Sequence, residues 1–193
     1  MERKIVLFIV MLVHSLFNVS AQDDFQLSSG ILRAQGAFAM GRLTESKATQ
    51  IYIKGDLSYY LDSKVSVRAD GFYFVDSQDK TNKPFDFSHS LFTGMSYHLG
   101  KGAAIDPYVG LQPGINFARL GNLETTLPIS PNSTSWSPVI SGHVGFNYYA
   151  PKIFHLFVHL QYIQGRFVNQ LNSQSLSEFR ISFGLGWNID VVK

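Results

Sequence analysis

The sequence has no cysteine and is poor in charged residues. Of its 193 residues, only 16% are Asp, Glu, Lys or Arg, against roughly 25% in an average soluble domain. The missing cysteines exclude a disulfide framework, a thiolate metal site and a lipid anchor on cysteine. The formal net charge of +2 is too small to indicate a nucleic-acid or strongly acidic partner, and no nucleic-acid-binding motif is present.

Long hydrophobic runs are also missing after the N-terminus. No segment there reaches about 18 consecutive apolar residues, which excludes a transmembrane helix. At the N-terminus, Arg3 and Lys4 precede an apolar run over residues 5–12, and small residues at 19–21 precede a polar stretch. This pattern predicts a secretory signal peptide over residues 1–21 and one exported domain over residues 22–193. An N-terminal membrane anchor is disfavoured, because the run is shorter than the ~20 residues that a spanning helix needs.

Strict period-two alternation is the strongest pattern that the sequence does contain. In residues 178–189 every second side chain is apolar, and the positions between them are small or polar. This alternation predicts a β-strand whose two faces meet different surroundings. A strand over a soluble core would usually turn Lys, Glu and Thr toward water, whereas this polar face is small and suits a narrow lumen. The apolar positions are Phe179, Ile181, Phe183, Leu185, Trp187 and Ile189.

Eight segments alternate in this way, and their connections follow a rule. Connections after the third, fifth and seventh segments are long and the one after the first is modest, while those after even segments are short. This arrangement predicts an all-β fold, an eight-stranded antiparallel up-and-down transmembrane β-barrel, with the loops at one end and the short turns and both termini at the other. The longest loops are expected at 76–87 and 120–136, and Pro113 requires a bulge or a bend. The predicted strands cover residues 30–42, 50–61, 65–75, 88–99, 106–119, 138–149, 153–166 and 178–189.

A secreted soluble barrel of the lipocalin kind would also alternate, but it would turn a Lys- and Glu-rich face to water. Here the polar face holds mainly Gly, Ser, Asn and His. On the opposite face, which would contact lipid, no position in the middle of a strand carries a charge. Aromatic residues of the apolar face gather near the strand ends, at the two levels where a bilayer has its interfaces. Those expected near the short turns are Tyr59, Tyr97, Tyr148, Phe154 and Trp187, and those expected near the loops are Tyr73, Phe117, Tyr162 and Phe179.

Two stretches resemble known bacterial proteins. S-F-G-L-G-W-N-I (182–189) looks like the C-terminal strand signal read by the outer-membrane assembly machinery, although residues 190–193 follow it here. P-Y-V-G-L-Q-P-G-I-N-F (107–117) is similar to a strand of the small OmpA-like, OmpX-like and OmpW-like barrels. The resemblance implies a location in the bacterial outer membrane, contact with its lipid and lipopolysaccharide, and the assembly machinery as a partner during biogenesis.

Most charged residues of the predicted strands fall on the lumen side. Lys54 and Asp56 lie beside Arg68 and Asp70 of the next strand, so we expect opposite charges to pair across the strands. Because an eight-stranded barrel is just wide enough to be filled by side chains, these residues predict a polar plug, with a narrow selective pore for small solutes as the alternative. The predicted interior network comprises Arg33, Lys54, Asp56, Arg68, Asp70, His143, His159, Glu178 and Arg180.

Histidines on the lumen side raise the question of a metal site. Four of them face inward, on the fourth, sixth and seventh strands at unequal heights: His98, His143, His155 and His159. Metal ligands have to converge, so we interpret these side chains as interior hydrogen-bonding groups and predict no metal and no cofactor.

A lipid-modifying outer-membrane enzyme is the alternative to a structural or adhesive role. His89 and Ser90, near Asp86, supply a base and a nucleophile, but adjacent residues of a strand face opposite sides and cannot readily touch. We therefore assign no catalytic residue and predict a non-enzymatic protein.

The long polar loops are the predicted binding surface for a ligand outside the cell. Phe85, Phe87 and Trp136 fall within these loops, where they either anchor a partner or rest on the barrel rim.

Overall fold

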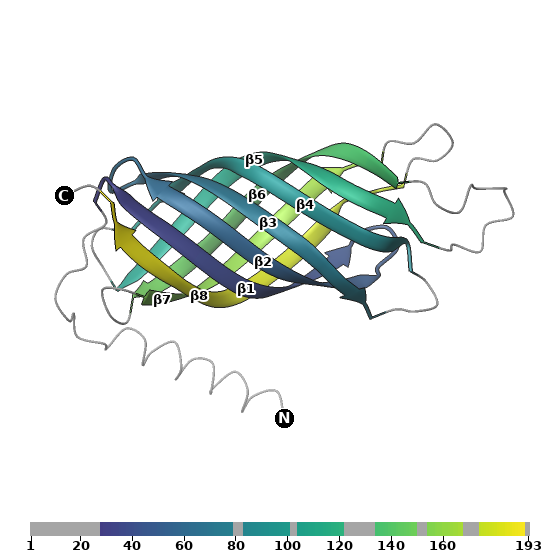
Figure 1. Ribbon diagram of the computed structural model, residues 1–193, viewed down its shortest axis with the longest axis horizontal. Helices are drawn as coiled ribbons and strands as arrows, with labels where there is room; N and C mark the ends of the chain where they lie inside the picture. The colour runs from purple at the N-terminus through teal and green to yellow at the C-terminus, as the bar shows by residue number, and fades with distance from the viewer. Residues whose placement is uncertain are drawn as a thin grey trace, which may run out of the picture.

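Eight antiparallel strands close into one barrel in the computed structural model (Figure 1), as the sequence predicted. The structure describes residues 28–78, 83–100, 104–121, 134–149, 154–167 and 174–191, and the predicted signal peptide lies outside them. Each strand pairs with its neighbours along the chain, and β1 pairs with β8. The strands are β1 (Ile31–Leu43), β2 (Thr49–Tyr60), β3 (Val65–Ser77), β4 (Phe85–His98), β5 (Ile105–Leu120), β6 (Thr134–Tyr149), β7 (Phe154–Gly165) and β8 (Glu178–Asp190).

The alternation of each strand separates an apolar outer surface from a polar interior. In β8, Phe183 points outward and is 57% exposed, while its neighbour Ser182 points inward and is fully buried. The other strands repeat the arrangement, and all eight lie strongly tilted to the long axis of the barrel (Figure 1). None of the described residues forms a helix long and apolar enough to cross a membrane.

The strands extend further toward the loops than the sequence predicted. β3 continues to Ser77 and β4 begins at Phe85, so only residues 78–84 connect them. β5 and β6 likewise leave residues 121–133 between them. The predicted loops 76–87 and 120–136 were therefore too long, because polar side chains at a strand end do not prevent backbone pairing.

Pro113 does not produce the expected bulge. The β4–β5 pairs on its two sides, Phe92↔Gly114 and Met95↔Leu111, belong to one register. On its other side the strand pairs with β6 without interruption, through Pro113↔Ile140. The ring therefore interrupts one ladder locally, where proline has no N–H to donate, and leaves the register unchanged.

One short turn at the terminal end is held by its own side chain. The backbone N–H groups of Lys64 and Val65 donate to Asp62 Oδ1 at 2.6 and 2.8 Å. These bonds favour the charged carboxylate and lower the pKa of Asp62. They fix the connection between β2 and β3 and thereby support the pairing of these strands.

Glycines divide cleanly between the two faces of the strands. A Cβ atom would meet another atom closer than 3.0 Å at every inward strand glycine, whereas the outward glycines have room for one. The inward face is therefore crowded at its glycines, by backbone of the adjacent strand or by interior side chains such as those of Tyr108 and His143. The crowded positions are Gly41, Gly94, Gly110, Gly114, Gly145, Gly165, Gly184 and Gly186, and the open ones are Gly36, Gly55, Gly71 and Gly142.

This division makes opposite predictions for two neighbouring positions. Gly184→Val should lower the free energy of unfolding by about 1–3 kcal/mol, because the new Cβ would strike the Gly36 carbonyl and Ala37. Gly36→Val adds the same side chain to the outer face, where nothing lies within 4 Å, and should be tolerated. Denaturant titration of the refolded barrel measures both, and equal loss in the two variants would contradict the different crowding of the two faces.

Candidate functional site: a filled lumen

Four charged side chains meet at the centre of the lumen and form the central charge cluster: Lys54, Asp56, Arg68 and Asp70. Lys54 Nζ lies 2.7 Å from Asp56 Oδ2 and 3.0 Å from Asp70 Oδ1. Arg68 reaches the same two carboxylates at 3.2 and 2.8 Å. Both aspartate side chains and that of Lys54 are completely buried. The cluster holds two cations and two anions, so its formal charge is zero.

Neutral groups from the opposite wall complete the central level. Gln112 donates from its amide to Asp70 Oδ2 at 2.5 Å, and the Tyr108 ring lies 5.5 Å from the Arg68 guanidinium. The imidazole rings of His143 and His159 are 5.1 Å apart. Side chains from β2, β3, β5, β6 and β7 thus span the lumen at one level.

A second polar group, the turn-end cluster, fills the lumen near the termini. Arg33 donates to the Tyr149 hydroxyl and, at 3.2 Å, to Asn188 Oδ1. Asp106 lies 2.7 Å from His98 Nδ1 and accepts from Asn147 at 3.0 Å and from the Tyr149 hydroxyl at 3.2 Å. Asp106 is the only carboxylate of this cluster within the described residues, and its partners come from β4 and β6.

Gln35 joins the turn-end cluster to the central one. In the amide orientation that satisfies both of its ends, its nitrogen donates to Asp56 Oδ1 at 2.7 Å and its oxygen accepts from His155 Nε2 at 2.7 Å. The His155 ring lies 5.4 Å from the Tyr149 ring of the turn-end cluster, so Gln35 and His155 together bring the two polar levels into contact.

The third polar level lies toward the loops. Arg180 binds Glu178 at 2.8 Å and donates to Ser90 Oγ at 2.6 Å. The Tyr52 hydroxyl stands between the two charges, 3.0 Å from Glu178 and 3.1 Å from Arg180. The guanidinium also lies 4.1 Å from the centre of the Tyr52 ring.

Above these polar levels, an apolar cap closes the loop end of the lumen. Its members are buried, and most come from the loop-side ends of the strands and from the connections between them. Phe72 and Phe92 lie deeper, in the middle of β3 and β4, and the Phe72 ring is 4.6 Å from the Arg180 guanidinium. Water entering from this end would first have to displace the cap. The cap includes Leu43, Ala48, Phe72, Phe74, Phe85, Phe92, Ala118, Leu120, Val139, Ile163, Phe167 and Leu176.

The structure brings together most of the residues that the sequence placed inside, and it adds others. All nine members of the predicted interior network are buried. Asp106, Tyr52 and the apolar cap were missed. Asp106 was missed because it precedes a proline, which indicated only the start of a strand. It lies two residues before Tyr108 in β5, and so its side chain points to the same, inward face. Phe85 lies fully buried in the cap, so the prediction of an exposed loop aromatic was wrong.

Two histidines are closer than their strand positions suggested. His143 and His159 are offset by two positions in the β6–β7 register, yet their rings lie 5.1 Å apart. The described residues nevertheless contain no group of three or more side chains arranged to hold a metal ion.

His89 and Ser90 point to opposite faces, as strand geometry requires. Ser90 is buried against Arg180, whereas the His89 ring stacks on Tyr73 at 4.6 Å and on Phe87 at 5.2 Å outside the barrel. His89 Nδ1 accepts from the Phe74 backbone N–H at 3.1 Å. The suspected base and nucleophile are therefore not in contact.

Aromatic side chains form a nearly continuous row around the loop end of the outer surface. Besides the stacking on His89, Phe87 lies 5.3 Å from Phe117, and Phe117 lies 4.4 Å from Trp136. Tyr162 and Phe179 continue the row on β7 and β8, 4.6 Å apart. Toward the terminal end, Tyr59, Tyr97, Phe154 and Trp187 are exposed and Tyr148 is half-buried.

The fold is shared with several solved structures. Neisserial surface protein A (NspA) matches 83% of this chain and 98% of its own, with a TM-score of 0.63 and 17% identity. The N-terminal β-barrel domain of Pseudomonas aeruginosa OprF matches 84% and 100%, with a TM-score of 0.60 and 15% identity. The chain has the fold of the small outer-membrane β-barrels. Ail, the attachment invasion locus protein of Yersinia pestis, shares it over 83% and 99%, at a TM-score of 0.53 and 10% identity. No protein-family model and no curated protein matches the chain.

The central charge cluster makes a testable prediction about stability. Lys54→Met should lower the free energy of unfolding by about 3–5 kcal/mol, because it leaves two buried carboxylates sharing one cation. Adding Asp56→Asn restores charge balance and should recover part of this loss. Lys64→Met, in the exposed turn, is the matched control and should change little. Denaturant titration in phosphatidylcholine vesicles compares the four proteins, and equal stability of Lys54→Met and wild type would contradict the pairing.

Proposed function

We propose that the protein is an integral barrel of the bacterial outer membrane with a closed lumen, serving the envelope structurally and binding surface ligands through its loop end. The observation that carries this proposal is the filled interior. Three polar levels and an apolar cap occupy the lumen from the terminal end to the loops.

The outer surface supports the membrane location. Large apolar side chains are exposed on every strand, and a soluble protein would turn so wide an apolar surface away from water. Aromatic residues stand at both ends of this surface, as expected at the two interfaces of a bilayer. Residues 1–21, interpreted as a signal peptide, would direct export across the inner membrane.

The filled lumen favours a structural role over a pore. The central charge cluster is neutral and its side chains are almost fully inaccessible, so an ion would have to separate pairs that already satisfy one another. Moving an ion past them would also require rearrangement of the apolar cap. Both barriers oppose steady conduction.

The loop end supports the adhesive part of the proposal. β5 and β6, of 16 residues each, are the longest described strands and remain paired up to Arg119↔Thr134. Near this paired end, the rings of Phe117 and Trp136 lie 4.4 Å apart on the outer surface. Ail, whose name refers to attachment and invasion, shares the fold and has been solved in complex with the heparin analogue sucrose octasulfate.

The closed lumen is tested in planar bilayers. Purified protein that migrates differently on gels before and after boiling is a folded barrel, and it should produce no steady conductance because the paired charges and the apolar cap obstruct the lumen. Boiled protein and protein-free bilayers are the controls. Discrete channel openings by the folded protein would instead favour the narrow pore, while a missing mobility shift would contradict the barrel in the membrane.

A further inference from the structure

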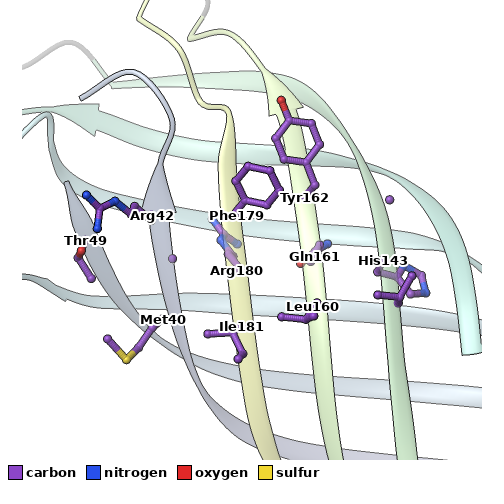
Figure 2. A pocket seen from close by; sticks show the side chains of 13 residues that line it. Met40, Arg42, Thr49, His143, Leu160, Gln161, Tyr162, Phe179, Arg180 and Ile181 are labelled. Atoms are coloured by element: carbon purple, nitrogen blue, oxygen red, sulfur yellow. The ribbon is translucent and has the colours of Figure 1, made fainter. Parts of the chain in front are cut away.

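A groove crosses the outer surface of the barrel and ends at the positively charged side chain of Arg42. Its volume is about 610 Å³, and its walls come from β1, β2, β6, β7 and β8 (Figure 2). Arg42 and Thr49 stand at its loop-side end, where they pair across β1 and β2. Gly142 lies in its floor at the far side. The walls between them are apolar and exposed: Met40, Val144, Leu160 and Ile181.

Strand register explains why these residues form one line. Arg42 pairs with Phe179, Phe179 pairs with Tyr162, and Tyr162 pairs with Gly142. At about 4.8 Å between neighbouring strands, the three steps from Arg42 to Gly142 cover about 14 Å. The tilt of the strands carries this line from the loop-side rim toward the middle of the barrel, because Gly142 is central in β6 while Arg42 is next to last in β1.

Because Gly142 has no side chain, a second hollow adjoins the groove on the outer surface. A neighbouring hollow of about 1020 Å³ shares Gly142, Val144 and Tyr162 with the groove and continues over Met95 and Leu111. The groove is thus a depression in the outer surface that continues into a second apolar hollow.

Arg42 differs from the other strand arginine at the loop-side rim. Arg119 already has side-chain partners: its guanidinium lies 5.0 Å from the centre of the Phe87 ring and donates a hydrogen bond to Thr134 Oγ1 at 3.4 Å. Arg42 is exposed, and within the described parts of the chain it makes no ion pair with a carboxylate. Figure 2 shows its guanidinium beside Thr49, above Met40. The aromatic row of the loop end is interrupted at this point, between Phe179 and Tyr73.

We propose that this groove binds one phosphorylated membrane lipid, with a headgroup phosphate on Arg42 and Thr49 and an acyl chain lying across Phe179 and Tyr162 toward Gly142. The guanidinium presents paired N–H donors that match phosphate oxygens, and a threonine hydroxyl adds a further donor. An arginine at the level of the interface reaches the headgroups while its stem covers apolar surface. The lipid belongs to the leaflet on the loop side.

This inference rests on the proposed membrane location and names a ligand for the outer surface. Lipid A is the probe, because it carries both phosphate groups and acyl chains. Folded full-length protein in zwitterionic micelles is titrated with lipid A, and native mass spectrometry measures the lipid-bound fraction. Wild type should retain one lipid A molecule. Dephosphorylated lipid A should bind about five- to tenfold more weakly, the loss expected for one cation–phosphate contact.

Two variants and two matched controls locate the site. Arg42→Gln removes the charge, and Gly142→Leu fills the groove at a position where a Cβ atom has room, with Leu111 Cδ2 at 3.6 Å. Each should weaken lipid A binding about five- to tenfold. Arg119→Gln removes a rim arginine away from the groove, and Gly36→Leu adds a leucine to the outer face elsewhere. Both should bind lipid A as wild type does.

The outcomes separate this inference from the membrane proposal. Gel mobility before and after boiling is measured on every variant, so a protein without a shift has failed as a barrel. If the shift is present and Arg42→Gln and Gly142→Leu bind lipid A like wild type, the lipid site is wrong while the barrel stands. If Arg119→Gln weakens lipid A binding as much as Arg42→Gln does, the effect comes from general surface charge and the proposed site is wrong. If inorganic phosphate displaces lipid A, the ligand is a phosphate group and not a lipid.

Discussion

The pairing of β1 with β8 is the contact on which the rest of the structure depends. It runs from Ile31↔Asp190 to Leu43↔Glu178 and removes the two edges that an open eight-stranded sheet would leave. In a bilayer each unpaired backbone group costs several kcal/mol, so closure decides whether the sheet can enter hydrocarbon at all. Closure with eight strands also sets the width of the lumen. The narrow interior then dictates which residues can point inward.

A narrow lumen explains why charges, aromatics and glycines occur together inside. Long side chains such as Lys54 and Arg68 reach their partners across the interior, and glycines such as Gly110 and Gly186 make room for His143 and His155. A charge held there without water needs a partner of opposite sign, which is supplied by carboxylates on the same or adjacent strands. The same filling that stabilises the barrel opposes conduction through it. On the outer face, by contrast, glycines such as Gly142 leave open space beside the neighbouring strands.

The sequence predicted the fold well because alternation is a local property that each strand displays by itself. Strand number, strand faces and the long and short connections followed from it, and the paired positions of Lys54, Asp56, Arg68 and Asp70 followed from adjacency of β2 and β3. Contacts between distant strands were not predictable, since Ser90 meets Arg180 and Asp106 meets Tyr149 only through register and barrel closure. Phe85 was misplaced because a polar neighbourhood hid a strand start. The line from Arg42 to Gly142 crosses four strands and has no signature along the chain.

Barrel closure in the membrane is the central claim, and amide hydrogen exchange of the folded protein in phosphatidylcholine vesicles tests it most directly. If β1 and β8 are paired, their amides should be protected to the same degree as those of β4 and β5, which lie opposite in the sheet. Rapid exchange confined to β1 and β8 would reveal two free edges. That result would contradict the closed barrel and, with it, the filled lumen and the proposed role in the membrane.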